Sequence, residues 1–346
     1  MNTTRKAEID IAKGFAVFLV ILGHIVIMHQ TMFRWIFSFH MPAFFILSGM
    51  TFHPERYSTP GTFIKKKGPR LLLIYFSVTL IGLAICLIRP AYRTFTLENG
   101  WGYLLKAIFY YGQPQHIYVG QVWFLAALFF AELIAWGWFR CLSEKSAVVK
   151  GWSLLILALI AVNISRINPY LPIGQRLPWK LDTALCAAVF VIAGVYATRT
   201  DLFGRLVPLA PFLVPLFVWL SYYLGPCLIT YVNICDCVYN GAVYYFAGAF
   251  IGSAALILAA WWSPSLPCRP FFAFWQFCGR NSLQIFVAHT FVTWIYAEIF
   301  TALTGIELVP AERMPGRLSC LMLSLAVLLT ITAFLWVFGK LRQHRR

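Results

Sequence analysis

The sequence predicts an all-α polytopic integral membrane helical bundle of about ten transmembrane helices, with both termini in the cytoplasm. Hydrophobic residues make up 60% of the 346 residues, charged residues only 12%, and the mean hydropathy is +0.74. A soluble domain does not have this composition. Apolar segments of about 20 residues, the length that crosses a bilayer, follow one another along the chain. Most of its 28 lysines and arginines lie in alternate connecting segments, which the positive-inside rule assigns to the cytoplasm.

The apolar segments are expected to form a single membrane domain over residues 1–346. The predicted spans cover residues 11–29, 35–53, 71–89, 119–139, 151–165, 181–198, 207–224, 240–262, 281–300 and 318–339. The fifth is short, and the seventh carries Pro208, Pro211 and Pro215, so these two have the least defined ends. The first apolar run has the length of a span and is followed by no small-residue cleavage site, so it predicts a membrane helix rather than a signal peptide.

Charge and cysteine content exclude two other classes of function. The net charge of +16 comes from residues gathered between spans, which is a topology signal, and no nucleic-acid reader motif accompanies it. The nine cysteines contain no CxxC pair, so no metal site is expected. Cys227, Cys235 and Cys237 share one loop that we place outside, where a disulfide is permitted.

The first span carries ionisable side chains along one stripe. Asp10 lies about four helical turns before His24, and Lys13 about three turns before it. The stripe leads from the charged mouth of the helix to a histidine ~20 Å deeper. An ionisable side chain facing lipid costs roughly 2.5–3.5 kcal/mol, so we interpret the stripe as one wall of a polar cavity. Asp10 is too far from His24 to orient it and is expected to pair with Lys13 or Arg5.

The second span places His40 two residues before Pro42. Proline removes a backbone donor and usually bends a helix, and such a break in a membrane requires protein or cavity water around the freed carbonyl. His24 and His40 are both expected in the outer half of the bilayer. Each has a structural alternative, a hydrogen bond to a neighbouring helix.

Further polar residues accompany the later spans. The inner segment FIKKKGPRLLLIYF, interpreted as a loop leading into the third span, concentrates cations that serve either topology or an anionic ligand such as a nucleotide phosphate. Glu132 lies in the fourth span, and Asp182 lies near the outer edge of the sixth. Asn281 and Ser282 open the ninth span, where they also suit a helix start, and His289 follows about two turns deeper.

These motifs identify a family. The chain resembles the acyltransferase-3 membrane O-acyltransferases, and is most similar to the fucose 4-O-acetylase-like branch, through IDIAKGFAVFLVILGH, SFHMPAFFILSGM, KKKGPRLLLIY, QVWFLAALF, KLDTALCAAVF and GRNSLQIFVAH, which stand in the family's order. The resemblance implies a multi-pass enzyme of the bacterial inner membrane. It would transfer an acyl group, usually acetyl from cytoplasmic acetyl-CoA, to a hydroxyl of an envelope glycan or glycolipid.

The resemblance also implies the site. His24 would be catalytic, with Asp10 and Lys13 on its donor side, and Lys67 and Arg70 would meet the acyl-CoA donor. The family often has Arg-x-x-Arg where this chain has Lys67-x-x-Arg70, and lysine lacks the bidentate fork of arginine. We expect no bound cofactor or metal. The expected partners are acetyl-CoA, a glycan or lipid-linked sugar and membrane lipid, with no nucleic acid.

Acyl transfer to an alcohol requires a base, and neutral histidine suits that role near neutral pH. His40, Asp182, Asn281, Ser282 and His289 are the candidates for acceptor binding or for lining the cavity. A secondary transporter is the alternative from another class, because its site also lies near the midplane around broken helices; a non-catalytic scaffold leaves the intramembrane charges without a purpose. The sequence does not identify the acceptor. Direct transfer to the acceptor and transfer through an acyl-histidine intermediate both stay open.

Overall fold

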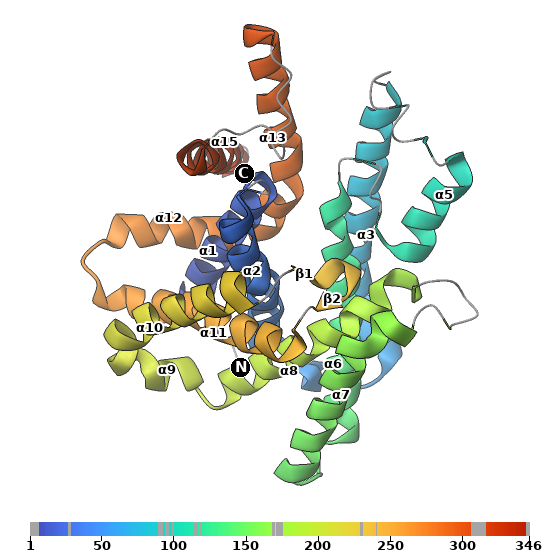
Figure 1. The fold of residues 1–346 in the computed structure, drawn as a ribbon, viewed down its shortest axis with the longest axis vertical. Helices are drawn as coiled ribbons and strands as arrows, with labels where there is room; N and C mark the ends of the chain where they lie inside the picture. The colour runs from blue at the N-terminus through green and yellow to red at the C-terminus, as the bar shows by residue number, and fades with distance from the viewer. Residues whose placement is uncertain are drawn as a thin grey trace. The chain divides into compact units, whose positions relative to one another are not determined.

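The computed structural model describes residues 7–26, 29–88, 93, 97–98, 100–113, 117, 119–167, 170, 176–228, 231–239, 241–305 and 316–343. These residues are almost entirely helical (Figure 1), which confirms the all-α class. The helices are α1 (Ala7–Ile25), α2 (Gln30–Met50), α3 (Pro60–Ile88), α5 (Gly100–Lys106), α6 (Trp123–Cys141), α7 (Ala147–Ile167), α8 (Leu181–Arg199), α9 (Leu202–Leu206), α10 (Ala210–Tyr222), α11 (Ala242–Trp262), α12 (Arg269–Arg280), α13 (Ser282–Thr304) and α15 (Arg317–Gln343). Strands β1 (Val232–Asn233) and β2 (Val238–Tyr239) pair antiparallel.

Each of the ten predicted spans overlaps a helix of the described residues, while residues 27–28, 89 and 240 of these spans lie outside the described residues. Within the described ranges, eight helices are long and apolar enough to cross a membrane. The two that are not among them are α1 and α2, which have 19 and 21 residues. They are long enough but more polar, since α1 carries Glu8, Asp10 and Lys13 and α2 carries Arg34 and His40. The chain is therefore a multi-pass membrane protein.

The chain forms two compact units. The first comprises Met1–Phe44, Asp201–Thr230 and Val243–Arg346, and the second comprises Phe45–Thr200 and Tyr231–Ala242. In the first unit α1 packs along α12 and also against α13 and α15 (Figure 1). In the second unit α6 packs against α3 and α8, and α7 packs against α8.

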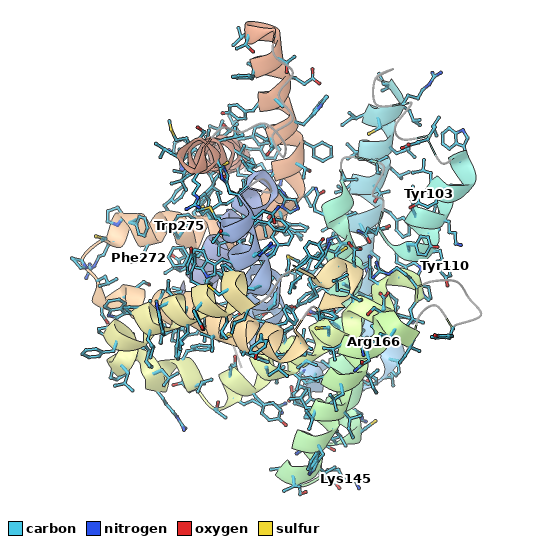
Figure 2. The ribbon with its side chains drawn as sticks, viewed as in Figure 1. Tyr103, Tyr110, Lys145, Arg166, Phe272 and Trp275 are labelled. Carbon is cyan, nitrogen blue, oxygen red and sulfur yellow. The ribbon has the colours of Figure 1, made fainter. Side chains whose placement is uncertain are left out.

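The packing of α1 on α12 depends on two glycines. A Cβ at Gly279 would lie 1.6 Å from the carbonyl oxygen of Asp10, and one at Gly14 would lie 2.2 Å from that of Trp275. The two backbones thus meet where no side chain intervenes, as small residues allow in membrane helices. Trp275, labelled on α12 in Figure 2, packs its ring against Phe15 and Phe18, at centroid distances of 5.1 and 5.7 Å.

Gly279→Ala is therefore expected to destabilise the protein, because the new methyl group overlaps backbone that cannot rotate away. Overpacking of this kind typically costs about 1–3 kcal/mol. Gly137→Ala is the matched control: nothing lies within 4 Å of its Cβ on α6, and alanine favours a helix over glycine by up to about 1 kcal/mol. Thermal midpoints in detergent should fall for Gly279→Ala and stay or rise for Gly137→Ala. Equal midpoints would contradict the close approach.

The segment before the third span corrects the sequence interpretation, because residues 60–70 are helical rather than a loop. Pro60 is the first residue of α3, a position that suits proline. Thr59 and Thr62 cap the helix reciprocally: the Thr62 N–H donates to the Thr59 hydroxyl at 3.2 Å, and the Thr59 N–H donates to the Thr62 hydroxyl at 3.1 Å. Pro69 removes the hydrogen bond to the Lys65 carbonyl on an exposed face of the helix.

Candidate active site

The polar stripe of the first span lies on α1, a helix that contains Asp10, Lys13 and His24. Asp10 is 1% exposed, whereas Lys13 and His24 are half-buried. Arg280, the last residue of α12, brings its Nε within 3.5 Å of the Asp10 carboxylate. This ion pair was not foreseen, since we expected Lys13 or Arg5 as the partner of Asp10. Arg5 lies outside the described residues.

His24 meets a second histidine. The rings of His24 and His289 lie 5.1 Å apart, centroid to centroid, at an interplanar angle of 58°. The His24 Nδ1 lies 2.8 Å from the carbonyl oxygen of Val20, one turn earlier on α1. A carbonyl oxygen only accepts hydrogen bonds, so Nδ1 carries the proton and Nε2 of the neutral ring carries a lone pair. This is the tautomer in which Nε2 can act as a base.

His289 has the same tautomer for the same reason. Its Nδ1 donates to the carbonyl of Phe286 at 2.6 Å. The side chain is 1% exposed, and among the described residues no hydrogen-bond partner meets its buried Nε2. Two acceptor nitrogens therefore belong to one pair of neighbouring rings, which can bind a donor such as a hydroxyl group.

His40 is 2% exposed, and its Nδ1 donates to the carbonyl of Ile36 at 2.7 Å. Its ring packs on that of Phe37, with the ring centroids 4.8 Å apart. The helix continues through Pro42 to Met50. His24, His40 and His289 are thus all on helices of the first unit.

Asn281 and Ser282 lie at the junction of α12 and α13. The Asn281 amide donates to the carbonyl of Phe277 at 2.9 Å, which satisfies the last turn of α12, and it makes no capping bond to α13. Ser282 is the half-buried first residue of α13. Sequence reasoning missed α12 itself, although the buried residues Trp275, Cys278 and Gly279 have the three- and four-residue spacing of a helix face.

The basic turn of α3, residues 65–70, belongs to the second unit. Lys67 Nζ lies 2.6 Å from Oε2 of Glu132 on α6, and Ser48 of α2 donates its hydroxyl to Oε1 at 2.8 Å. Glu132 is 2% exposed, Lys67 21%. Arg70, one turn further along α3, is exposed. The sequence signal for this ion pair was an ionisable residue within an apolar span, but it did not name the partner.

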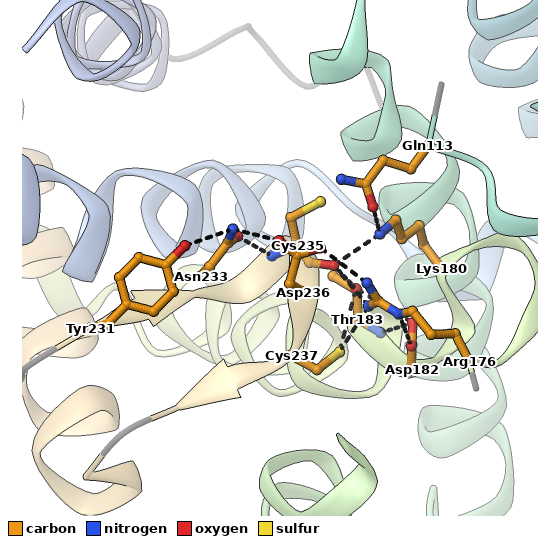
Figure 3. Close-up of polar contacts among 10 residues, drawn as sticks. All are labelled: Gln113, Arg176, Lys180, Asp182, Thr183, Tyr231, Asn233, Cys235, Asp236 and Cys237. Carbon is orange, nitrogen blue, oxygen red and sulfur yellow. Dashed lines mark hydrogen bonds and ion pairs between the residues drawn. The ribbon is translucent and has the colours of Figure 1, made fainter. Parts of the chain in front are cut away.

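Asp182 belongs to a buried polar network of the second unit (Figure 3). Its carboxylate, fully buried, accepts from Nε of Arg176 at 2.9 Å and from the N–H of Thr183 at 2.8 Å. Burial alone would lower the pKa of Arg176, but Asp182 holds that pKa above its usual range. Arg176 also donates to Asp236 at 3.0 Å and to the Cys235 carbonyl at 2.9 Å. The geometry of Asp182 is that of a structural anchor.

Lys180 completes this network. It is 1% exposed and donates to the Cys235 carbonyl at 2.9 Å and to the side-chain oxygen of Gln113 (Figure 3). Trp179 and Lys180 have φ of 55° and 59°, a strained backbone that a rigid network can hold. Burial raises the pKa of the Cys235 thiol to about 12 and that of Cys237 to about 11. Both thiols are protonated at neutral pH and are poor nucleophiles, and all described cysteines are free.

Comparison with known proteins supplies one finding. The family model of the acyltransferase domain of acyltransferase family 3 matches residues 6–340, nearly the whole chain. No curated protein and no solved structure matches the chain.

Proposed function

The chain belongs to acyltransferase family 3, and from that premise we propose that it is an O-acyltransferase of the bacterial inner membrane. It takes an acetyl group from cytoplasmic acetyl-CoA and transfers it to a hydroxyl of a cell-envelope glycan or glycolipid. The proposal includes ten spans and cytoplasmic termini. Family membership and the eight membrane-capable helices among the described residues already make the chain a membrane acyltransferase. The donor, the acceptor and the assignment to the bacterial inner membrane are the proposed part.

The observation that carries the proposal is the tautomer of His24 together with its partial exposure. Its Nδ1–H is held by the Val20 carbonyl at 2.8 Å, so Nε2 keeps its lone pair, and the residue is half-buried. His40 and His289, by contrast, are buried. A base needs both an available lone pair and access to the proton that it removes.

In the proposed reaction, Nε2 of His24 is the base. His24 Nε2 accepts the proton of the acceptor hydroxyl while the hydroxyl oxygen attacks the thioester carbonyl. The new carbon–oxygen bond forms, the carbon–sulfur bond breaks, and the proton passes from Nε2 to the departing CoA thiolate. A transient acyl-histidine uses the same lone pair. In both routes the Val20 carbonyl stabilises the imidazolium through the Nδ1–H bond.

The other residues divide between the two substrates. We assign Lys67 and Arg70, with Asp10 and Lys13, to binding of the acyl-CoA donor; cations at such a site suit the phosphates of CoA. We assign His40, Asn281, Ser282 and His289 to acceptor binding or to the lining of the cavity. Asp182, in the buried network of the second unit, stays a candidate for the same role. Acetyl-CoA is a substrate, so the reaction requires no bound cofactor.

The acceptor can be found directly. Mass spectrometry of envelope glycans from cells with the intact gene and from cells without it should show an O-acetyl group, an increment of one acetyl, that is lost with the gene. Identical glycans, together with no release of CoA from acetyl-CoA by the purified protein and an envelope extract, would refute the proposed activity.

Topology gives a separate prediction. Cysteines introduced at Ser58 and Glu98, both exposed, are expected to label differently with a membrane-impermeant thiol reagent in a background without native cysteines. Position 58 should be shielded, because the positive-inside rule places it in the cytoplasm, and position 98 should react. The reverse pattern would put the basic turn of α3 on the wrong side for cytoplasmic acetyl-CoA.

A further inference from the structure

The cations of the basic turn of α3 have two different environments: Lys67 forms an ion pair with Glu132, and Arg70 is exposed. Glu132 is 2% exposed on α6, where an ionised side chain needs a partner because membrane helices disfavour uncompensated charge. Both of its oxygens are engaged: Oε2 with Lys67 at 2.6 Å and Oε1 with the Ser48 hydroxyl at 2.8 Å. This one carboxylate thereby ties together the end of α2, the start of α3 and the middle of α6.

Lys67 is correspondingly constrained. Its ammonium group pairs with Glu132 and lies 5.3 Å from the centroid of the Phe52 ring, an arrangement that adds cation–π attraction. Only 21% of its side chain is exposed. An anion that approaches Lys67 therefore meets a neutral pair rather than a free positive charge.

Arg70 differs from Lys67 in its exposure. It lies three residues further along α3, so it is a neighbour of Lys67 on the helix surface, and it is exposed. Lys65 and Lys66, on the same turn, are also exposed. A guanidinium group binds phosphate through two parallel hydrogen bonds, which suits Arg70 to a nucleotide phosphate.

We infer that Lys67 is a positioning residue that neutralises Glu132, and that Arg70 is the residue of this pair that contacts the donor's phosphates. This inference refines the proposed function, on which its kinetic part rests. Loss of the Lys67 charge would weaken donor binding indirectly, since the unpaired carboxylate of Glu132 would repel the phosphates and loosen the start of α3.

A charge-removal cycle tests this. Lys67→Met should raise the KM for acetyl-CoA about tenfold, and Lys67→Met/Glu132→Gln should return it to within about threefold of wild type, because the repelling carboxylate is gone. Arg70→Met should raise that KM about ten- to a hundredfold, and Glu132→Gln should not rescue it. If the Lys67/Glu132 double variant keeps the KM of Lys67→Met, Lys67 contacts the donor itself and the inference is wrong. Rescue of Arg70→Met to the same extent would also overturn it.

A substrate-free measurement separates this inference from the proposed activity. Lys67→Met should lower the thermal midpoint in detergent by about 5 °C or more, the double variant should recover most of that loss, and Lys66→Met should leave the midpoint unchanged. An unchanged midpoint in Lys67→Met, or a double variant that also fails to accumulate, would mean that the pair does not anchor α3. These results stand even if the protein transfers no acetyl group.

Discussion

His24→Ala is expected to abolish acyl transfer while the protein still folds and inserts. The substitution removes the Nε2 lone pair, and a positioned general base typically contributes 10²–10⁴-fold to the rate. Among the described residues its one side-chain hydrogen bond lies within its own helix, so the substitution breaks no hydrogen bond between helices. The measurement is kcat/KM of the purified variant with acetyl-CoA and an envelope acceptor, beside its thermal midpoint.

His53→Ala is the matched control, because His53 is half-buried in the turn after α2 and belongs to neither substrate's proposed site. It should keep wild-type activity. Transfer by His24→Ala within tenfold of wild type, at an unchanged thermal midpoint, would remove His24 from the mechanism. Loss of activity with a collapsed midpoint would point to a structural role of the ring instead.

The sequence was most informative where the signal was local. Helical periodicity along one span aligned Asp10, Lys13 and His24, and all three do lie on α1. Hydropathy located the long helices, eight of which are apolar enough to cross a membrane within the described residues, because a span needs about 20 apolar residues wherever it lies in the chain. The same measure missed α12, a helix of 12 residues that is too short to span a bilayer. Hydropathy also predicted a loop for residues 60–70, because three lysines and a proline make this segment polar. The capping pattern of Thr59 and Thr62, which indicates a helix start, was not used.

Pairings between distant segments could not be predicted. His24 meets His289, Asp10 meets Arg280, and Lys67 meets Glu132, and each pair joins helices that hydropathy treats as independent. Intramembrane charge predicts that a partner exists, but its identity depends on how helices pack. At the α1–α12 crossing, that packing is determined by two glycines, Gly14 and Gly279, whose role is visible only when the opposing backbone is known.

Neutralising Lys67 and Arg70 together should impair use of the donor much more than use of the acceptor. The Arg70 substitution removes the proposed hydrogen bonds to phosphate. The Lys67 substitution leaves the charge of Glu132, whose side chain is only 2% exposed, without its partner. Charge-assisted bonds contribute ~1.5–3 kcal/mol each, and ~1.4 kcal/mol is tenfold in an equilibrium constant. With about tenfold from the Lys67 change and about ten- to a hundredfold from the Arg70 change, the KM for acetyl-CoA should rise by roughly 10²–10³-fold.

His40→Ala is the counterpart, expected to raise the KM for the acceptor instead, because His40 lies on α2 in the proposed outer half of the membrane, where an envelope acceptor would enter. Steady-state kinetics in detergent with both substrates varied distinguish the two variants, and kcat reports whether either also disturbs the chemical step. An unchanged donor KM in the Lys67/Arg70 double variant would leave the cluster with a role in topology alone. The donor would then have to enter beside Arg280 and Asn281, at the end of α12, or from elsewhere.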